Sequence, residues 1–178
     1  WLMAIFYSIP GNEIWDKYGS LSARLPSALS ALFLMIMIAD TIFCATDETK
    51  DKIRLSIIAS LSFALSPLII IWSRTAVSDS LLCATLGTSL LSFWRNISSE
   101  EDIPCITPWF FLAIAILTKG PVAFVIVFTT LFTFFLTHKN WKRFFCKLKI
   151  RKGLLITFLI SSPWYFIQLF HKGRVFWD

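Results

Sequence analysis

The chain has 178 residues, of which 56% are hydrophobic and only 16% are charged, and it carries a formal net charge of +6 at pH 7. Soluble domains average roughly 25% charged residues, so this composition excludes a water-soluble globular domain and indicates an integral membrane protein. The four cysteines, Cys44, Cys83, Cys105 and Cys146, show no paired spacing, which excludes a disulfide framework and a cysteine metal knuckle.

Hydrophobic segments of membrane-spanning character fill most of the chain. A spanning helix needs about 20 mostly apolar residues. Six candidate segments occur, at residues 25–44, 55–72, 79–95, 103–118, 121–137 and 153–170. We therefore predict an all-α fold, a polytopic membrane bundle of about six transmembrane helices. Residues 1–9 are apolar but too short to span, and we interpret them as the end of an earlier helix or as an interfacial segment.

Two of these segments have features that predict irregular helices. The apolar core of the fourth covers only about 21 Å at 1.5 Å per residue, against a hydrocarbon layer of about 30 Å. It either begins at Ile103 and Pro104 or pairs with the fifth segment as a shallow hairpin. Pro67 lies inside the second segment and predicts a bend or an early end there.

The two ends of the chain lie in apolar sequence, with Trp1 at the start and FWD at the finish. We interpret residues 1–178 as one transmembrane domain that is an internal piece of a longer membrane protein. On this interpretation an N-terminal helix with its loop, and a C-terminal part, belong to the protein but not to this stretch. The alternative is that the true start was simply not included in the sequence.

Basic residues are concentrated in alternate loops. Three loops, at residues 45–54, 95–102 and 138–152, hold eleven of the seventeen lysines and arginines. Alternating topology places all three on one face, which the positive-inside rule makes cytoplasmic. Such loops set topology and attract anionic membrane lipids, so we expect membrane lipids as partners and no nucleic acid.

The stretch SRTAVSDSLL lies on the opposite, outer face, at the joint between the second and third segments. Ser78 is placed to cap the third helix, and Asp79 then occupies its first turn, where the helix dipole favours a carboxylate. One interpretation is therefore that Asp79 is a capping residue and Arg74 an interfacial anchor. The other is that this charged pair at the membrane boundary binds a polar ligand.

The stretch ILTKGPVAF is typical of a tight turn between two helices. Gly120 suits a left-handed position at a helix end, and Pro121 suits the first turn of the next helix. Lys119 then lies beside the start of a helix, an arrangement that attracts phosphate. The alternative is a lysine that extends toward the membrane surface without a ligand.

The stretch GNEIWDKYGSLSARLPSAL contributes the remaining polar candidates on the outer face. Ser22 is placed to cap the first long helix, and Arg24 lies near its outer end. Glu13 or Asp16 can ligand a divalent cation such as Mg²⁺ or Mn²⁺, because carboxylate oxygens suit hard cations. One carboxylate is not a metal site, so a solvated loop is the alternative.

These motifs occur in a recognisable order: ARLPSAL, an R-x-x-x-x-D joint, TKGP, then PWY followed by FW. The order resembles the membrane part of the aminoarabinose-transferase-like and dolichyl-phosphate-mannose-protein mannosyltransferase-like glycosyltransferases. These are C-type enzymes that use polyprenyl-phosphate sugars. The resemblance covers essentially the whole chain, and ARLPSAL and TKGP are its most specific pieces.

The resemblance implies an activity and a set of residues. The protein would transfer a glycosyl group from a polyprenyl-phosphate-linked donor to a lipid, glycan or protein acceptor, at the outer face of the cytoplasmic membrane. Asp79 matches the family's acidic motif residue and is the candidate catalytic group. Lys119 matches the lysine that faces the carrier phosphate, and Arg74 and Arg24 lie where basic residues hold the anionic donor. A divalent cation is a possible cofactor.

The resemblance also implies what lies outside this stretch. The main catalytic acid of the family would precede Trp1, and a histidine-containing motif would follow Asp178. We therefore expect these 178 residues alone to be inactive. The alternative function is a non-catalytic carrier-lipid transporter or flippase, which should show charged or broken helices near mid-membrane.

Overall fold

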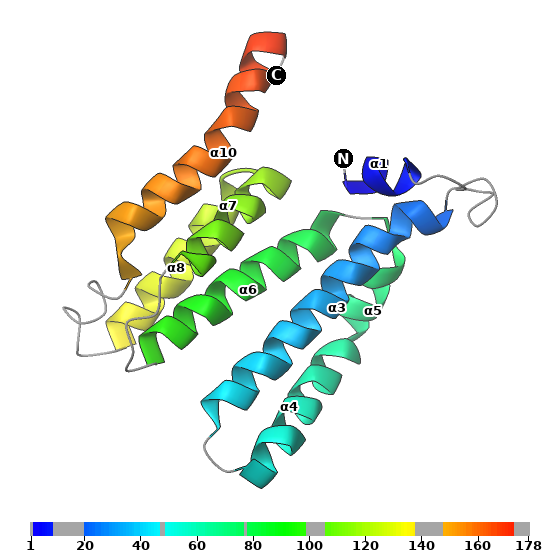
Figure 1. Cartoon of the computed structure of the whole chain (residues 1–178), viewed down its shortest axis with the longest axis vertical. Coiled ribbons are helices and arrows are strands. Elements are labelled where there is room, and N and C mark those ends of the chain that lie inside the picture. Colours follow the sequence, from blue (N-terminus) through cyan, green and yellow to red (C-terminus); the bar gives the residue numbers. More distant parts are fainter. Residues whose placement is uncertain are drawn as a thin grey trace. The chain divides into compact units, whose positions relative to one another are not determined.

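The computed structural model describes residues 2–8, 20–46, 49–76, 78–98, 106–137 and 148–172. Within these residues the chain forms helices joined by turns, and no strand (Figure 1). The all-α prediction is therefore confirmed. The chain divides into two compact units, residues 1–87 and 88–178, and the division falls inside one helix. The prediction of a single transmembrane domain stays a prediction.

The first unit is built around α3 (Ser20–Ala45). The short helix α1 (Leu2–Tyr7), the longer α4 (Thr49–Ala64) and α5 (Pro67–Arg74) all pack against α3, as Figure 1 shows. The first half of α6 (Ser78–Ser98) completes this unit. The predicted segment 25–44 is thus confirmed as a helix, which begins five residues earlier than its apolar run.

The second predicted span is broken, as Pro67 indicated. The axes of α4 and α5 differ by 64° across a break of a few residues. Pro67 begins α5, where its missing N–H costs no hydrogen bond, and Ser66 before it is extended, with φ −60° and ψ 127°. The ring thus ends one helix and starts the next, so the chain changes direction without losing helical structure on either side.

Helices α3 and α6 approach closely within the first unit. A Cβ atom built on Gly87 would lie 2.8 Å from a terminal methyl group of Leu34, so the glycine allows the two helices to meet. The hydroxyl of Ser80 donates a buried hydrogen bond of 2.7 Å to the carbonyl of Ser27. Small residues and interhelical hydrogen bonds of this kind are typical of helix packing in membranes.

The second unit contains the second half of α6 together with α7 (Thr107–Lys119), α8 (Val122–Thr137) and α10 (Ile150–Lys172). Helix α7 contacts both α8 and α10. It has only 13 residues and is followed at once by α8, which agrees with the predicted short hairpin. Helix α10 continues through Pro163.

Trp109 forms the centre of the second unit. Its ring is 5% exposed, meets Phe93 edge-on with centroids 5.2 Å apart, and donates a 3.1 Å hydrogen bond from Nε1 to the carbonyl of Leu148. A Cβ atom on Gly153 would overlap the indole, so this glycine is what lets α10 lie against the ring. The hydroxyl of Thr157 donates to the carbonyl of Trp109 at 3.2 Å.

Length and composition make this a multi-pass membrane protein. Among the described residues, α3 and residues 150–170 of α10 are each long and apolar enough to cross a membrane, and the bent pair α4–α5 qualifies as a third span. Helices α7 and α8 are apolar but shorter. Many large apolar side chains on these helices are exposed, as expected where lipid rather than water surrounds the protein.

Candidate functional site

Three of the predicted site residues lie at one end of the first unit. Helix α5 ends at Arg74 and α6 begins at Ser78, only four residues later, so the two helix ends are within about 14 Å of each other. The Ser80–Ser27 hydrogen bond attaches the first turn of α6 to α3, one turn beyond Arg24. Arg24, Arg74 and Asp79 thus belong to the same end of the unit, where Figure 1 shows these helices meeting.

Asp79 lies in the first turn of α6 and is half-buried. This position agrees with the sequence prediction. A carboxylate there is stabilised by the helix dipole by about 0.3–1 kcal/mol. The hydrogen bond from the adjacent Ser80 fixes the backbone that carries this carboxylate.

Arg24 is exposed on the second turn of α3, but the predicted cap beside it is wrong. Helix α3 starts at Ser20, so Ser22 lies inside the helix instead of before it, and its side chain is completely buried. The cap was predicted from the residue type alone, and the helix extends farther toward the N-terminus than the apolar pattern indicates. Arg24 itself lies near the N-terminal end of α3.

Arg74 is the last helical residue of α5 and is exposed. The chain turns extended at Thr75, with φ −100° and ψ 148°. The hydroxyl of Thr75 donates to the carbonyls of Ile71 and Trp72, at 3.1 and 3.3 Å. This satisfies two carbonyls at the helix end, which stabilises the position from which the guanidinium extends.

Lys119 belongs to the second unit, at the turn between α7 and α8. Gly120 has φ 81° and ψ −159°, a conformation restricted to glycine, and its N–H donates to the carbonyl of Ile116 at 2.7 Å. The hydroxyl of Tyr165, on α10, donates to the same carbonyl at 3.1 Å. Lys119 is therefore the last residue of α7, and two hydrogen bonds to the Ile116 carbonyl stabilise the turn that follows it.

The hydrogen bonds from Ser80 and Tyr165 were not anticipated from the sequence. In the sequence, Ser80 is only part of the SRTAVSDSLL joint, and Tyr165 is only part of the PWY motif. Each positions the turn that carries a candidate residue, Asp79 in one case and Lys119 in the other. The sequence did offer one signal for these bonds: a polar side chain within an apolar helical segment, which needs a hydrogen-bond partner in the bilayer.

A metal site has no support among the residues that the structure describes. Glu13 and Asp16 lie outside those residues. Within the described ranges no three histidine, cysteine, aspartate or glutamate side chains come together as a metal-binding group. The divalent cation therefore stays a sequence-based expectation.

Comparison with known proteins identifies the family. A profile described as "Dolichyl-phosphate-mannose-protein mannosyltransferase" matches residues 1–167. The chain belongs to this mannosyltransferase family. The resemblance found in ARLPSAL and TKGP is thereby confirmed, and the family match spans the end of the first unit that carries Arg24, Arg74 and Asp79 as well as the turn at Lys119.

A solved structure has the same fold as this member of the mannosyltransferase family. It is the crystal structure of ArnT from Cupriavidus metallidurans in the apo state, with a TM-score of 0.80 and 19% sequence identity. The match covers 96% of this chain and 30% of the ArnT chain, so the chain spans about a third of the length of that protein. No curated protein sequence matches this chain.

Proposed function

We propose that this protein is a membrane glycosyltransferase. It transfers a glycosyl group from a polyprenyl-phosphate-linked sugar to a lipid, glycan or protein acceptor, at the outer face of the cytoplasmic membrane. The observation that carries the proposal is the family match over residues 1–167, together with the two exposed arginines and one carboxylate at a single end of the first unit.

The reaction needs positive charge next to the carrier phosphate. The bond between the anomeric carbon of the sugar and the phosphate oxygen breaks, and the polyprenyl phosphate leaves with an added negative charge. A hydroxyl or amine of the acceptor forms the new bond to the anomeric carbon and loses its proton to a base. Cations that contact the phosphate stabilise the leaving group as its charge develops.

The residues of this chain have roles that fit this chemistry. Arg24 and Arg74 bind the phosphate, because the planar guanidinium matches phosphate oxygens in a two-pronged geometry. Lys119, in the second unit, is a further candidate for binding phosphate, on the basis of its TKGP motif. Asp79 contacts the acceptor group and accepts its proton or a hydrogen bond from it. The polyprenyl chain remains in the surrounding lipid, so only the headgroup needs a polar site.

The distribution of charge also favours the proposed face. The cations at the start of α4, at the end of α6 and at the start of α10 are Lys52, Arg54, Arg95, Lys149, Arg151 and Lys152. If successive helix ends alternate between the two membrane faces, these cations lie on one face, and Arg24, Arg74 and Lys119 lie on the other. By the positive-inside rule the larger group faces the cytoplasm, so the donor site faces outward.

Among the described residues, the broken helix α4–α5 gives little support to the alternative function, a transporter. Transporters use broken helices near mid-membrane to bind substrates and ions. The break between α4 and α5 consists of Leu65 and Ser66, flanked by Ala64 and Pro67, and none of these carries a charge. The break changes the direction of the chain but offers no charged site to a translocated ion.

The proposal is tested by substitution in the natural protein, expressed in membranes. The donors are a panel of polyprenyl-phosphate sugars with tritium in the sugar. Asp79→Asn and Lys119→Ala are each assayed for transfer of the labelled sugar to the acceptor. We expect each variant to lower the transfer rate on the order of 100-fold, the size of a lost general base or of a lost charge at a leaving group. Asp40→Asn is the matched control, because Asp40 is exposed near the opposite end of α3.

The outcomes separate the two classes of protein. Loss of transfer in both variants, with normal membrane insertion and a normal Asp40→Asn control, supports the transferase. Near-normal transfer by both variants would show that these residues do not form the donor site. If the unmodified protein transferred no sugar but moved a labelled carrier lipid across the membrane, the protein would be a flippase and not a transferase.

A further inference from the structure

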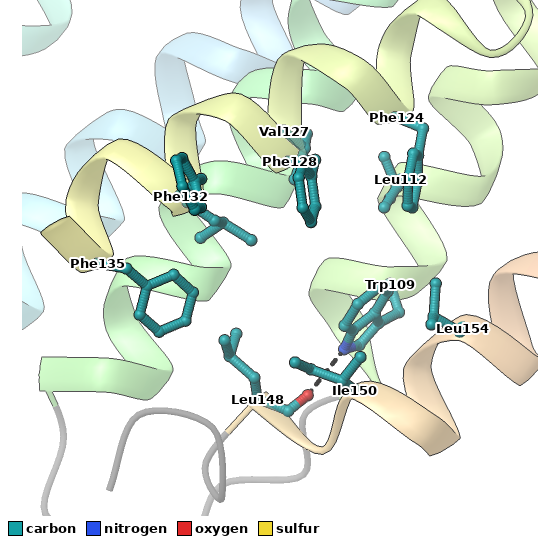
Figure 2. Close-up of a pocket in the computed structure, with 11 residues that line it drawn as sticks. Trp109, Leu112, Phe124, Val127, Phe128, Phe132, Phe135, Leu148, Ile150 and Leu154 are labelled. Carbon is teal, nitrogen blue, oxygen red and sulfur yellow. Dashed lines mark hydrogen bonds between the residues drawn. The ribbon is translucent and has the colours of Figure 1, made fainter. Parts of the chain in front are cut away.

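The second unit holds an apolar cavity of about 350 Å³ that the proposed chemistry does not use. It lies between α7, α8 and the beginning of α10, and all of its lining residues are apolar (Figure 2). Trp109, Leu112 and Leu148 are buried members of this lining, each at most 5% exposed. Apolar cavities of this kind do not hold water but do hold hydrocarbon ligands.

One wall of the cavity is a row of aromatic rings on α8. Phe124, Phe128 and Phe132 follow each other at four-residue intervals and stack with centroids 6.1 and 6.3 Å apart and interplanar angles of 14° and 13°. Figure 2 shows these rings directed from α8 toward the space opposite Trp109. Phe128 is 59% exposed even though it lines the cavity, so the cavity is a groove that is open at its side.

The length of the groove suits one leaflet of a bilayer. Its lining along α8 extends from Phe124 to Phe135, which is roughly 16 Å at 1.5 Å per residue. A bilayer has a hydrocarbon layer about 30 Å thick, so one leaflet contributes roughly half of this. The groove therefore has the length of one lipid acyl chain, with a smooth aromatic wall on one side.

Cations alternate with lining residues at the start of α10. Leu148 and Ile150 line the groove, and Lys149, Arg151 and Lys152 between and after them are exposed. The bond from the Trp109 indole to the carbonyl of Leu148 fixes this backbone against the groove. The first turn of α10 contains no acidic residue, so the positive end of the helix dipole is not neutralised by its own side chains.

We propose that this groove holds one acyl chain of an anionic membrane phospholipid, whose phosphate is bound by Lys149, Arg151 and Lys152. Basic residues between membrane helices on the cytoplasmic side bind anionic lipid headgroups through the same charge complementarity. The site is separate from the donor site, because it uses none of Arg24, Arg74, Asp79 or Lys119. It holds whether or not the protein is a transferase.

The test uses phosphatidylglycerol that carries a photoreactive group on one acyl chain, with the natural protein in nanodiscs. Cross-linked residues are mapped by mass spectrometry, and we expect them on α8, at Phe128 and Phe132, and near Leu148. Each basic residue contributes roughly fivefold to the binding of anionic lipid, so the triple variant Lys149→Gln, Arg151→Gln, Lys152→Gln lowers cross-linking on the order of 100-fold. Arg54→Gln, on α4, is the charge control and leaves the yield unchanged.

A second pair of variants tests the acyl-chain part independently of charge. Leu154 lines the groove and is 41% exposed, whereas its neighbour Leu155 is 59% exposed and does not line it. Leu154→Trp fills the groove and abolishes cross-linking on α8, while Leu155→Trp keeps it. Neither position is buried, so both tolerate a larger side chain. A difference in cross-linking between the two variants therefore reports on the groove and not on misfolding.

The competitors decide between the possible occupants. Competition by unlabelled phosphatidylglycerol but not by phosphatidylcholine or inorganic phosphate supports the proposal. Equal labelling by a phosphatidylcholine probe, with no effect of the triple variant, would overturn the headgroup part and leave an unselective apolar groove. Stronger competition by polyprenyl phosphate, or cross-links between two copies of the protein, would also overturn it, in favour of the carrier lipid or of self-association.

Discussion

Ser80 donates a 2.7 Å hydrogen bond to the carbonyl of Ser27, and this bond attaches the first turn of α6 to α3. The two residues are 53 positions apart in the chain, and both are buried. Because Asp79 precedes Ser80, the bond fixes the backbone that carries the proposed catalytic carboxylate. The geometry of the proposed site thus depends on a neutral hydroxyl that has no chemical role in transfer.

Replacing Ser80 by alanine should weaken the attachment of α6 to α3. Interhelical hydrogen bonds in membranes average about 0.6 kcal/mol, so we expect Ser80→Ala to lower the free energy of unfolding by about that amount. Reversible unfolding of the purified protein in mixed micelles measures it. Ser62→Ala is the control, because the Ser62 hydroxyl bonds only to the Ile58 carbonyl of its own helix. Equal losses in both variants would show that the Ser80–Ser27 bond has no special role.

Replacing Arg74 by glutamine should weaken binding of the phosphate donor. Hydrogen bonds to charged groups contribute about 1.5–3 kcal/mol, which corresponds to roughly 10–100-fold in the Kd for polyprenyl phosphate. Titration of the purified protein with polyprenyl phosphate in micelles measures this affinity. Arg74→Lys should recover only part of it, because lysine lacks the two-pronged geometry. Full affinity in Arg74→Gln would assign Arg74 to membrane anchoring, the alternative that the sequence left open.

The sequence predicted the helices well but not their contacts. Apolar runs locate α3, α8 and α10, Pro67 locates the break before α5, and Lys119-Gly120-Pro121 locates the turn after α7. These are local properties, set by residue polarity and backbone restriction within a few residues. The start of α3 at Ser20 was missed because helix formation continues past the apolar stretch, through residues that pack against neighbouring helices.

The contacts between distant residues could not be read from the sequence for a physical reason. Trp109 packs on Gly153, and Ser80 bonds to Ser27, because the folded chain brings helices together that no periodic pattern pairs. The apolar groove was missed in the same way. Its only local signals were the four-residue spacing of Phe124, Phe128 and Phe132 and an isolated glycine in α10, which indicates a close approach by another element.

Adding a methyl group at Gly153 should destabilise the second unit. The new Cβ would overlap the rigid indole of Trp109, whose ring is held by its hydrogen bond to Leu148. Overpacking of a well-packed core costs about 1–3 kcal/mol, and we expect Gly153→Ala to lose that much in the free energy of unfolding. Gly87→Ala is the matched control, because its Cβ meets only the end of the Leu34 side chain, which can rotate away. A larger loss in Gly87→Ala than in Gly153→Ala would contradict this packing.

Replacing Gly120 should disturb the turn that carries Lys119. A Cβ atom there would make an ordinary contact of 3.6 Å with the Tyr165 hydroxyl, so space is available. The backbone is the obstacle, since φ 81° with ψ −159° is accessible essentially to glycine alone. We therefore expect Gly120→Ala to cost about 1–3 kcal/mol and to lower transfer by displacing Lys119.

A comparison of alanine with asparagine makes this prediction sharper. Asparagine tolerates the ordinary left-handed region, with positive ψ, better than alanine does. It has no such advantage at ψ −159°, so Gly120→Asn should be as unstable as Gly120→Ala in mixed-micelle unfolding. Tyr165→Phe removes the hydrogen bond to the Ile116 carbonyl, and the loss of that bond should cost about 0.6 kcal/mol. Recovery of stability and transfer in Gly120→Asn would mean that the turn is an ordinary left-handed helix end, with Lys119 directed differently from the turn described here.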